Sequence, residues 1–181
     1  MIHGIGNSEE SWNEVIKRLP DTIRVVTVDL LGFGKSPKPR WAMYNASTQA
    51  RAVRKTLLQL GLFGKFHIVG HSLGSLVAIE MARRYKLANP TFYVDDSNVD
   101  SYMATLETMI INQTALRDVS RLRLPIHILR GVFDILVIPT HLGKLKKARK
   151  NISLHTVAAG HEIVGLYTHA VSDKVAAIVK K

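Results

Sequence analysis

The most informative residues of the chain are Gly-His-Ser-Leu-Gly at positions 70–74, where a serine lies between two glycines at G-x-S-x-G spacing. An apolar run at 66–69 precedes the motif, and a stretch with helical spacing follows it. A sharp strand-to-helix turn holds a serine hydroxyl out of a sheet, and the two glycines remove Cβ atoms that would collide there. The pattern therefore predicts Ser72 as a nucleophile. It also predicts the backbone N–H of Leu73 as a donor to the charge that develops on an acyl oxygen.

A serine becomes nucleophilic beside a base, and the base needs an acid that orients it. His161 follows the last expected strand, in a loop from which its ring can reach over the strand ends. Asp134 lies at the carboxyl end of the expected strand 126–130, where its carboxylate would accept the imidazole N–H or cap the next helix. With Ser72, these residues follow the chain order Ser, Asp, His. Three other carboxylates are alternatives for the acid: Asp95, Asp96 and Glu162.

The glycine-rich turn at residues 3–6, His-Gly-Ile-Gly, is a candidate for the other half of an oxyanion hole. Such a turn leaves amides unpaired and lets the backbone approach a substrate closely, although a flexible terminus has the same composition. We expect the N–H of Ile5 to donate to the oxyanion together with that of Leu73. The residues expected to shape the substrate pocket are His3, Gly4 and His71.

Two other patterns look like ligand sites but lack a necessary part. Residues 34–36, Gly-Lys-Ser, match the end of a phosphate-binding loop, but Asp29 occupies the position of the required first glycine. His67 and His71 have i, i+4 spacing, yet they straddle a strand and a turn and so do not share one helix face. No cysteine or clustered carboxylate accompanies them. We therefore expect no metal site and no cofactor.

Strand-like and helix-like segments alternate around these residues. The alternation predicts an α/β fold with a doubly wound, mostly parallel sheet and flanking helices. Ligands of such sheets bind beyond the carboxyl ends of the strands, where the candidate residues fall. The expected strands are 23–29, 66–69, 126–130 and 152–157. The expected helices are 8–19, capped by Ser8 and stopped by Pro20, and 47–60, 73–85, 102–116, 139–150 and 163–180; residues 30–45 are expected as a loop, and 90–95 as a short strand or a loop.

Length and composition indicate a single globular domain, residues 1–181, with 46% hydrophobic and 22% charged residues. No uncharged apolar run reaches the roughly 18 residues that a membrane span needs, so we expect no transmembrane helix and no membrane partner. The first residues lack the pattern of a signal peptide. The absence of cysteine fits a reducing compartment, and the expected location is the cytoplasm.

The chain is strongly basic, with a formal net charge of +11. A nucleic-acid interface is one interpretation of the basic run at 144–150, and the solvated face of a helix is the other. No nucleic-acid motif or aromatic interleaving accompanies the run, so we favour the helix face and expect no nucleic-acid partner. The expected partner is a small-molecule acyl substrate, and the sequence does not indicate an oligomeric state.

Together these motifs resemble the α/β-hydrolase superfamily, in its branch of small esterases and carbon–carbon bond hydrolases. The resemblance implies an eight-stranded sheet, a Ser-His-Asp triad and no cofactor. Ser72 at the elbow distinguishes the chain from the similar dehalogenase and epoxide-hydrolase branches, which place an aspartate there. The matching segments follow the order of the family: residues 3–6, 29–36, 70–74, 131–134 and 160–161.

Two departures from the family pattern concern the sheet and the cap. Family members have further strands before the His-Gly turn, whereas only Met1 and Ile2 precede it here. The last of those strands lies beside the elbow strand, so we expect a gap in mid-sheet and an incomplete N-terminal edge. Residues 89–124 offer little apolar strand and one cap-like helix, which predicts a reduced cap or lid. We interpret the chain as truncated at its N-terminus and internally shortened.

These observations predict a serine hydrolase that cleaves a small carboxylic ester or a related acyl substrate through an acyl-enzyme intermediate. Carbon–carbon bond hydrolysis is an alternative, because it uses the same triad. A non-catalytic α/β-hydrolase-like fragment or binding module is a further alternative, which the missing sheet elements favour. A basic nucleic-acid binder would be a third class, and salt-sensitive retention on DNA would reveal it.

Overall fold

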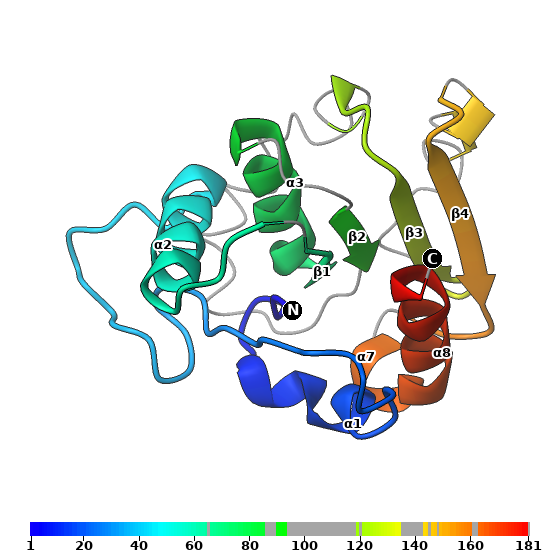
Figure 1. The fold of residues 1–181 in the computed structure, drawn as a ribbon, viewed down its shortest axis with the longest axis horizontal. Coiled ribbons are helices and arrows are strands. Elements are labelled where there is room, and N and C mark those ends of the chain that lie inside the picture. Colours follow the sequence, from blue (N-terminus) through cyan, green and yellow to red (C-terminus); the bar gives the residue numbers. More distant parts are fainter. Residues whose placement is uncertain are drawn as a thin grey trace.

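The computed structural model describes residues 1–64, 66–85, 119, 121–134, 143–144, 146–147, 149–160 and 163–180, and the backbone of 90–93. Its elements alternate between helix and strand along the chain (Figure 1). The N-terminal half contains η1 (Glu9–Trp12), α1 (Asn13–Ile16), α2 (Ala46–Gln59), β1 (Ile68–His71) and α3 (Leu73–Tyr85). The remainder contains β2 (Pro90–Tyr93), β3 (Ile126–Gly131), β4 (Ile152–Val157), α7 (Ile163–Leu166) and α8 (Thr168–Val179).

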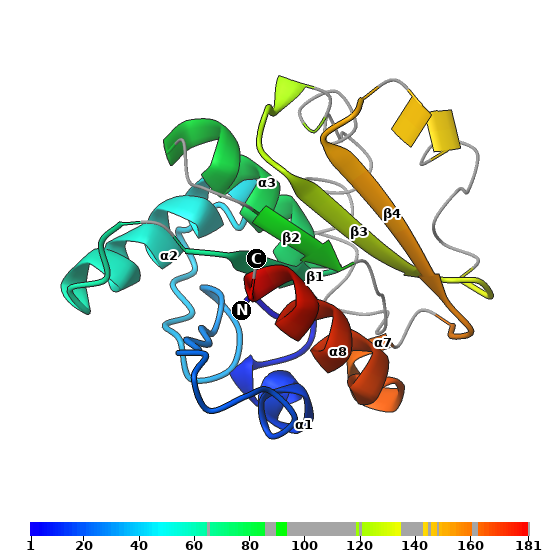
Figure 2. The ribbon, with the colours of Figure 1, turned by 45° about the vertical axis from the view of Figure 1, so that its right-hand side comes forward.

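The described residues contain four strands, where the resemblance implied eight, and these form one parallel sheet in the order β1-β2-β3-β4. Helices cover both faces of this sheet (Figure 2). Successive strand residues point to opposite faces, so each strand contributes to two cores. Ile68 packs in the core beneath α2 and α3, whereas Val69 packs with α1, α7 and α8. Ile128 and Leu129 divide in the same way. The fold is therefore the doubly wound α/β fold that the sequence predicted.

The N-terminal residues lie beside the elbow strand β1, which is the first strand of the sheet. Ile2 forms parallel bridges with Val28 on one side and Gly70 on the other. The N–H of His71 donates to the Ile2 carbonyl over 3.0 Å. The gap expected in mid-sheet is thus spanned at one residue. Residues 23–29, predicted as a strand, form only the single bridge from Val28 to Ile2, because Ile2 is the residue that pairs with this segment.

Helices α2 and α3 lie where the sequence placed them. The side chain of Asn45 caps α2 by accepting the Thr48 N–H over 2.9 Å. Gly61 follows this helix with φ +66°, the left-handed conformation in which glycine often terminates a helix. Helix α3 begins directly after Ser72, as the G-x-S-x-G motif requires.

Two predicted helices differ in the structure. Residues 8–19 form the short η1 and α1 instead of one helix, and the Ser8 side chain makes no capping bond. At the start of a continuous helix, the Glu9 N–H would bond to solvent or to a capping side chain. Here it donates to the Asp29 carboxylate over 2.7 Å. The C-terminal helix is divided at Tyr167 into α7 and α8.

Several expectations fall wholly or partly outside the described residues. The sequence left residues 90–95 open as a short strand or a loop. In the structure residues 90–93 form strand β2. The cap-like helix predicted at 102–116 lies outside the described residues. The basic helix predicted at 139–150 is described in part. Residues 143–144 and 146–147 are helical, whereas residues 149–150, also described, are not helical. Among the described residues, no helix has both the length and the apolar character needed to cross a bilayer.

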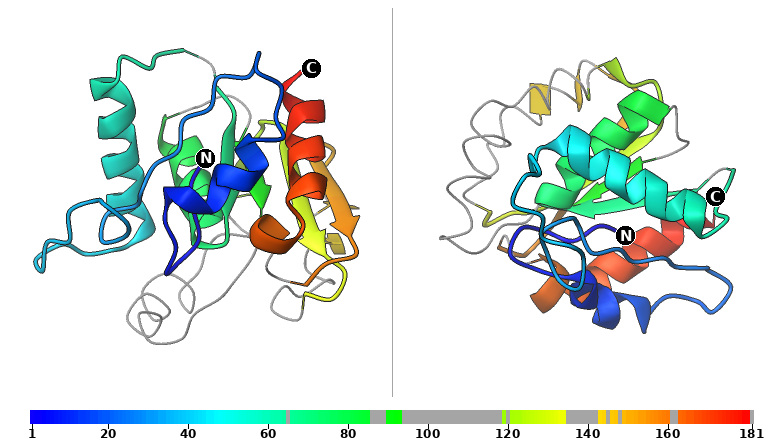
Figure 3. Two further views of the ribbon diagram at one scale, coloured as in Figure 1. Left: turned by 90° about the horizontal axis from the view of Figure 1, so that it is seen from below. Right: turned by 90° about the vertical axis from the view of Figure 1, so that its left-hand side faces the viewer.

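All four strands end at the same side of the molecule, as expected for a parallel sheet (Figure 3, left). The loop that precedes α2, the turn that follows β3, and α7 lie at this side. Within the described part of the chain, a site beyond the strand ends is therefore made from these segments and from the turn between β1 and α3.

Gly74→Ala tests the close contact between α3 and the N-terminal residues. A Cβ atom on Gly74 would overlap the carbonyl oxygens of Ile2 and His3, and backbone cannot move aside as a flexible side chain can. We expect a loss of about 3 kcal/mol in the free energy of unfolding, measured by urea denaturation. Gly143→Ala is the matched control, because a Cβ there meets nothing within 4 Å. It should leave stability unchanged or raise it by up to about 1 kcal/mol. Equal effects of the two substitutions would contradict the contact.

Candidate active site

Ser72 occupies the sharp turn between β1 and α3. Its φ is +47°, and it is the only non-glycine residue with a positive φ in the described part of the chain. A left-handed conformation costs a serine of order 1–3 kcal/mol and persists where the surroundings impose it. Its neighbours His71 and Leu73 are buried, whereas Ser72 retains partial exposure. The turn therefore presents the serine side chain at the surface of an otherwise buried segment.

Glycines on both sides make this turn possible. A Cβ atom on Gly70 would overlap the carbonyl of Gly74, and a Cβ atom on Gly74 would overlap the carbonyls of Ile2 and His3. The hydroxyl of Ser75 donates to the Gly70 carbonyl over 2.7 Å and joins the two ends of the turn. The strand–turn–helix context that the motif predicts is thus present, with the N-terminal segment packed directly against it.

The His3–Gly6 turn passes beside the serine. A Cβ atom on Gly4 would lie 3.3 Å from Cβ of Ser72 and 3.0 Å from Nδ1 of His71. Gly6 has φ +68°, which lets the chain reverse toward η1. Among the described residues, no acceptor takes a hydrogen bond from the Ile5 N–H or the Leu73 N–H. The backbone that lies beside Ser72 is thus that of Gly4, the residue directly before Ile5.

His3 is fully buried, and both of its ring nitrogens are engaged. The Leu30 N–H, which can only donate, lies 2.9 Å from Nε2, so Nε2 carries no proton. Nδ1 therefore carries the proton and donates to the Gly4 carbonyl over 2.6 Å. Burial lowers the pKa of His3 and outweighs the opposing effects of the Gly4 bond and of Asp29, so the ring is neutral at pH 7.

The hydrogen bond from His3 fixes more than the Gly4 carbonyl. The Gly4 C=O and the Ile5 N–H belong to one planar peptide group and point in opposite directions. Because the His3 ring holds the carbonyl, the Ile5 N–H is directed away from that ring. The orientation of the predicted oxyanion donor is thereby set by a buried side chain.

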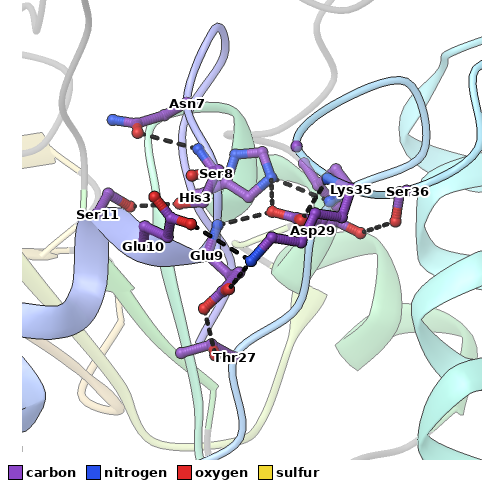
Figure 4. A network of polar contacts seen from close by, with 12 residues as sticks. His3, Asn7, Ser8, Glu9, Glu10, Ser11, Thr27, Asp29, Lys35 and Ser36 are labelled. Atoms are coloured by element: carbon purple, nitrogen blue, oxygen red, sulfur yellow. Dashed lines mark hydrogen bonds and ion pairs between the residues drawn. The ribbon is translucent and has the colours of Figure 1, made fainter.

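Asp29 links the segment that follows the His3–Gly6 turn to the loop that contains Lys35 (Figure 4). Its carboxylate accepts the backbone N–H groups of Glu9 and Lys35, each over 2.7 Å, and lies 3.9 Å from Nε2 of His3. Burial alone would raise the pKa of Asp29, but the two N–H donors, together with His3 and Lys35, more than offset this, and the pKa is lowered. A Cβ atom on Gly34 would overlap this carboxylate. The Asp29–Gly34 pair that fails as a phosphate loop is therefore part of the scaffold behind the site.

Asp134 lies at the carboxyl end of β3 and is buried. The turn that carries it packs against residues 159–160, because the Phe133 N–H donates to the Ala159 carbonyl over 3.0 Å. A Cβ atom on Gly131 would overlap the carbonyls of Ala159 and Gly160. The structure thus brings the Asp134 turn against residues 159–160, which directly precede His161 in the sequence. His161 itself, Glu162, Asp95 and Asp96 lie outside the described residues.

His71 lies at the end of β1, buried beneath the elbow. Its ring meets the ring of Trp12 edge to face, with centroids 6.2 Å apart. His67 lies before the same strand, and burial lowers its pKa. Within the described segments, no three histidine, aspartate or glutamate side chains are grouped as a metal site would need.

Comparison with known proteins identifies the family. A profile of the alpha/beta hydrolase fold matches residues 1–105, and the chain belongs to this family. It is 34% identical over 86 residues to a probable lysophospholipase, BODYGUARD 4, of Arabidopsis thaliana, a match that covers 46% of this chain and 21% of that protein. Lipase 3 of a Moraxella species is 32% identical over 85 residues, which cover 47% of this chain and 27% of the lipase. The matches thus span about a quarter of the length of these relatives.

Solved structures show the same fold over nearly the whole chain. An esterase from Mycobacterium tuberculosis superposes with a TM-score of 0.80 at 20% identity, covering 99% of this chain and 83% of the esterase. A meta-cleavage product hydrolase from Pseudomonas fluorescens superposes with a TM-score of 0.80 at 18% identity, covering 99% and 89%. At such identities the similarity shows the fold alone.

Asp29→Asn tests the scaffold behind the His3–Gly6 turn. An amide cannot accept both the Glu9 and the Lys35 N–H with its two terminal atoms, and one donor is left unpaired. We expect a loss of about 2 kcal/mol in the free energy of unfolding at pH 7. Because folding lowers the pKa of Asp29, its contribution is present above the ordinary aspartate pKa of about 4 and is lost as the pH falls through the lower folded value.

The difference between wild type and Asp29→Asn should therefore shrink on acidification, which urea unfolding at pH 7 and below pH 4 measures. Glu14→Gln is the control. Its carboxylate also has a lowered pKa, through a hydrogen bond with Lys17, but the pair is exposed to solvent. Its removal should change stability little. An Asp29→Asn protein as stable as wild type at pH 7 would overturn the assignment.

Proposed function

We propose that this chain is a serine hydrolase that cleaves a small carboxylic ester through an acyl-enzyme intermediate. The observation that carries the proposal is the strained, partly exposed Ser72, held at φ +47° beside the Gly4 backbone. Strain of this kind at a turn between a strand and a helix is typical of a nucleophile elbow. The names of two relatives, a probable lysophospholipase and a lipase, favour an ester over a β-diketone as the substrate class.

In the proposed reaction, Oγ of Ser72 attacks the ester carbonyl carbon while His161 takes the hydroxyl proton. The carbonyl oxygen becomes an oxyanion, which accepts hydrogen bonds from the N–H groups of Ile5 and Leu73. The tetrahedral intermediate then expels the alcohol, which receives its proton from His161. Water, activated by His161 in the same way, attacks the acyl-enzyme and releases the acid and free Ser72.

The rigidity of the oxyanion donors supports their proposed role. Donors that are already oriented stabilise the transition state without a further cost of reorganisation. The neutral ring of His3 holds the Gly4 carbonyl and so fixes the Ile5 N–H. We therefore assign His3 to the support of the turn and Gly4 to the backbone next to the substrate. His71, buried against Trp12, is assigned to the base of the pocket beneath Ser72.

Asp134 is the proposed acid of the triad. It is buried, and its turn is bonded to the residues that immediately precede His161. A buried carboxylate in this position would accept the imidazole N–H, fix the tautomer and stabilise the imidazolium that forms. Gly131, three residues before Asp134, lets β3 approach residues 159–160 closely, since a side chain there would collide with their backbone.

Labelling by a fluorophosphonate probe tests the nucleophile. The wild-type chain should be labelled stoichiometrically, because the probe's phosphorus is attacked by an activated serine. Ser72→Ala should abolish labelling while its circular dichroism spectrum stays unchanged. Ser153→Ala, a substitution on β4 away from the elbow, should be labelled like wild type. Folded wild-type protein that takes no label would overturn the proposal and favour a non-catalytic relative.

Asp134→Asn tests the acid. With a short-chain p-nitrophenyl ester, kcat should fall by a factor of about 10³–10⁴ with little change in KM, because the amide stabilises the wrong tautomer of His161. Glu162→Gln, the matched removal of the neighbouring carboxylate, should change kcat by less than about tenfold. If Glu162→Gln caused the larger loss, the acid would be misassigned, although Ser72 would remain the nucleophile.

A further inference from the structure

A loop on the same side as the elbow carries two large apolar side chains into solvent. Within residues 37–44, here called the Trp41 loop, Trp41 is 86% exposed and Met43 is 70% exposed. Trp12, the other tryptophan of the chain, is fully buried. Leaving a whole indole in water forgoes the favourable free energy of burying a large apolar side chain. Such exposure is expected where the side chain meets a partner.

Hydrogen bonds hold the Trp41 loop in one shape. The Ala42 N–H donates to the Pro39 carbonyl over 3.2 Å, which closes a turn with Trp41 at its corner. The hydroxyl of Tyr44 donates to the same carbonyl over 2.8 Å, and the Tyr44 ring packs against Gly32. Trp41 is therefore projected outward by a built turn, while the base of the loop is fixed to the scaffold of the candidate active site.

The sequence on both sides of this loop is strongly basic. No aspartate or glutamate occurs between Asp29 and Glu80, whereas seven lysines and arginines do. Lys38 and Arg40 precede Trp41 and are exposed, and the Lys38 ammonium donates to the Gly34 and Ser36 carbonyls. Lys35 adds little, because its ammonium group pairs with Glu9 and Glu10. The loop thus combines an apolar tip with two cationic side chains beside it.

Against the expectation of no membrane partner, we infer that the Trp41 loop binds the surface of an anionic lipid bilayer. An indole ring is suited to the interface between headgroups and acyl chains, because one end is apolar and the other carries a hydrogen-bond donor. Met43 would enter the acyl region beside it. Lys38 and Arg40 would pair with lipid phosphates while their aliphatic stems remain against the apolar layer. Apolar burial and charge together give reversible binding without a membrane-spanning segment.

The position of the loop fits this partner. The turn after β3 and α7 lie at the same side of the molecule (Figure 3, left), and they carry further exposed apolar side chains, Val132, Phe133 and Leu166. A bilayer against this side would face the carboxyl ends of the strands, where the elbow lies. A second copy of the chain is the less favourable occupant, because the two copies, each with a net charge of +11, repel each other.

Intrinsic fluorescence of the full chain tests the inference directly, because Trp12 is buried and Trp41 is exposed. Adding mixed phosphatidylcholine–phosphatidylglycerol vesicles should shift the emission to shorter wavelength, and the protein should sediment with them. Trp41→Ala combined with Met43→Ala should weaken partitioning, measured by sedimentation, by at least about tenfold. Lys38→Gln and Arg40→Gln should each weaken it by about fivefold, the equivalent of about 1 kcal/mol for a basic side chain near an anionic surface.

Leu60→Ala combined with Phe63→Ala is the matched control. It removes two exposed apolar side chains that follow α2, and binding should be unchanged. Every variant is compared with wild type by circular dichroism. Using Ser72→Ala protein throughout prevents any proposed hydrolysis of lipid, so the outcome does not depend on the proposed function. Failure to bind anionic vesicles, or binding that survives loss of Trp41 and Met43, would overturn the inference. An emission shift that follows protein concentration without vesicles would overturn it in favour of a second copy.

Discussion

Direct contact between three backbone segments is the constraint on which the site depends. The start of α3, the end of β1 and the N-terminal residues meet so closely that side chains are excluded at Gly70 and Gly74. The Ile2 backbone lies between the elbow strand and Val28 and is hydrogen-bonded to His71. Any widening of these contacts would move the His3–Gly6 turn away from Ser72 and separate the proposed oxyanion donors from the nucleophile.

A polar scaffold behind this contact keeps the turn in place. His3 and Asp29 share no strong ion pair, since the ring is neutral and lies 3.9 Å from the carboxylate. Each instead satisfies backbone groups: His3 those of Gly4 and Leu30, and Asp29 those of Glu9 and Lys35. Buried polar groups are favourable when all their hydrogen bonds are made. The same scaffold anchors the loop that carries Trp41, so the candidate active site and the proposed lipid-binding loop share one support.

Local signals predicted some elements closely and others poorly. Strand β4 and helix α3 have their predicted bounds, because a β-branched run and an amphipathic run leave few alternatives. The helix predicted at 8–19 was wrong, since the Asp29 carboxylate takes the Glu9 N–H and the first turn tightens into η1. The strand predicted at 23–29 was wrong because a strand needs a partner along its length, and local sequence does not show whether one is present.

The class of the fold and the position of the elbow follow from local sequence patterns. A serine between two glycines, after an apolar run and before an amphipathic one, restricts the backbone locally, and so its turn can be predicted from the residues alone. Long-range contacts, in turn, place Gly4 against Ser72, make His3 a neutral support and include Asp29 in the scaffold. They also leave Trp41 facing solvent while Trp12 is buried. These features depend on contacts between residues far apart in the chain, and the residue pattern around either partner does not indicate such a contact.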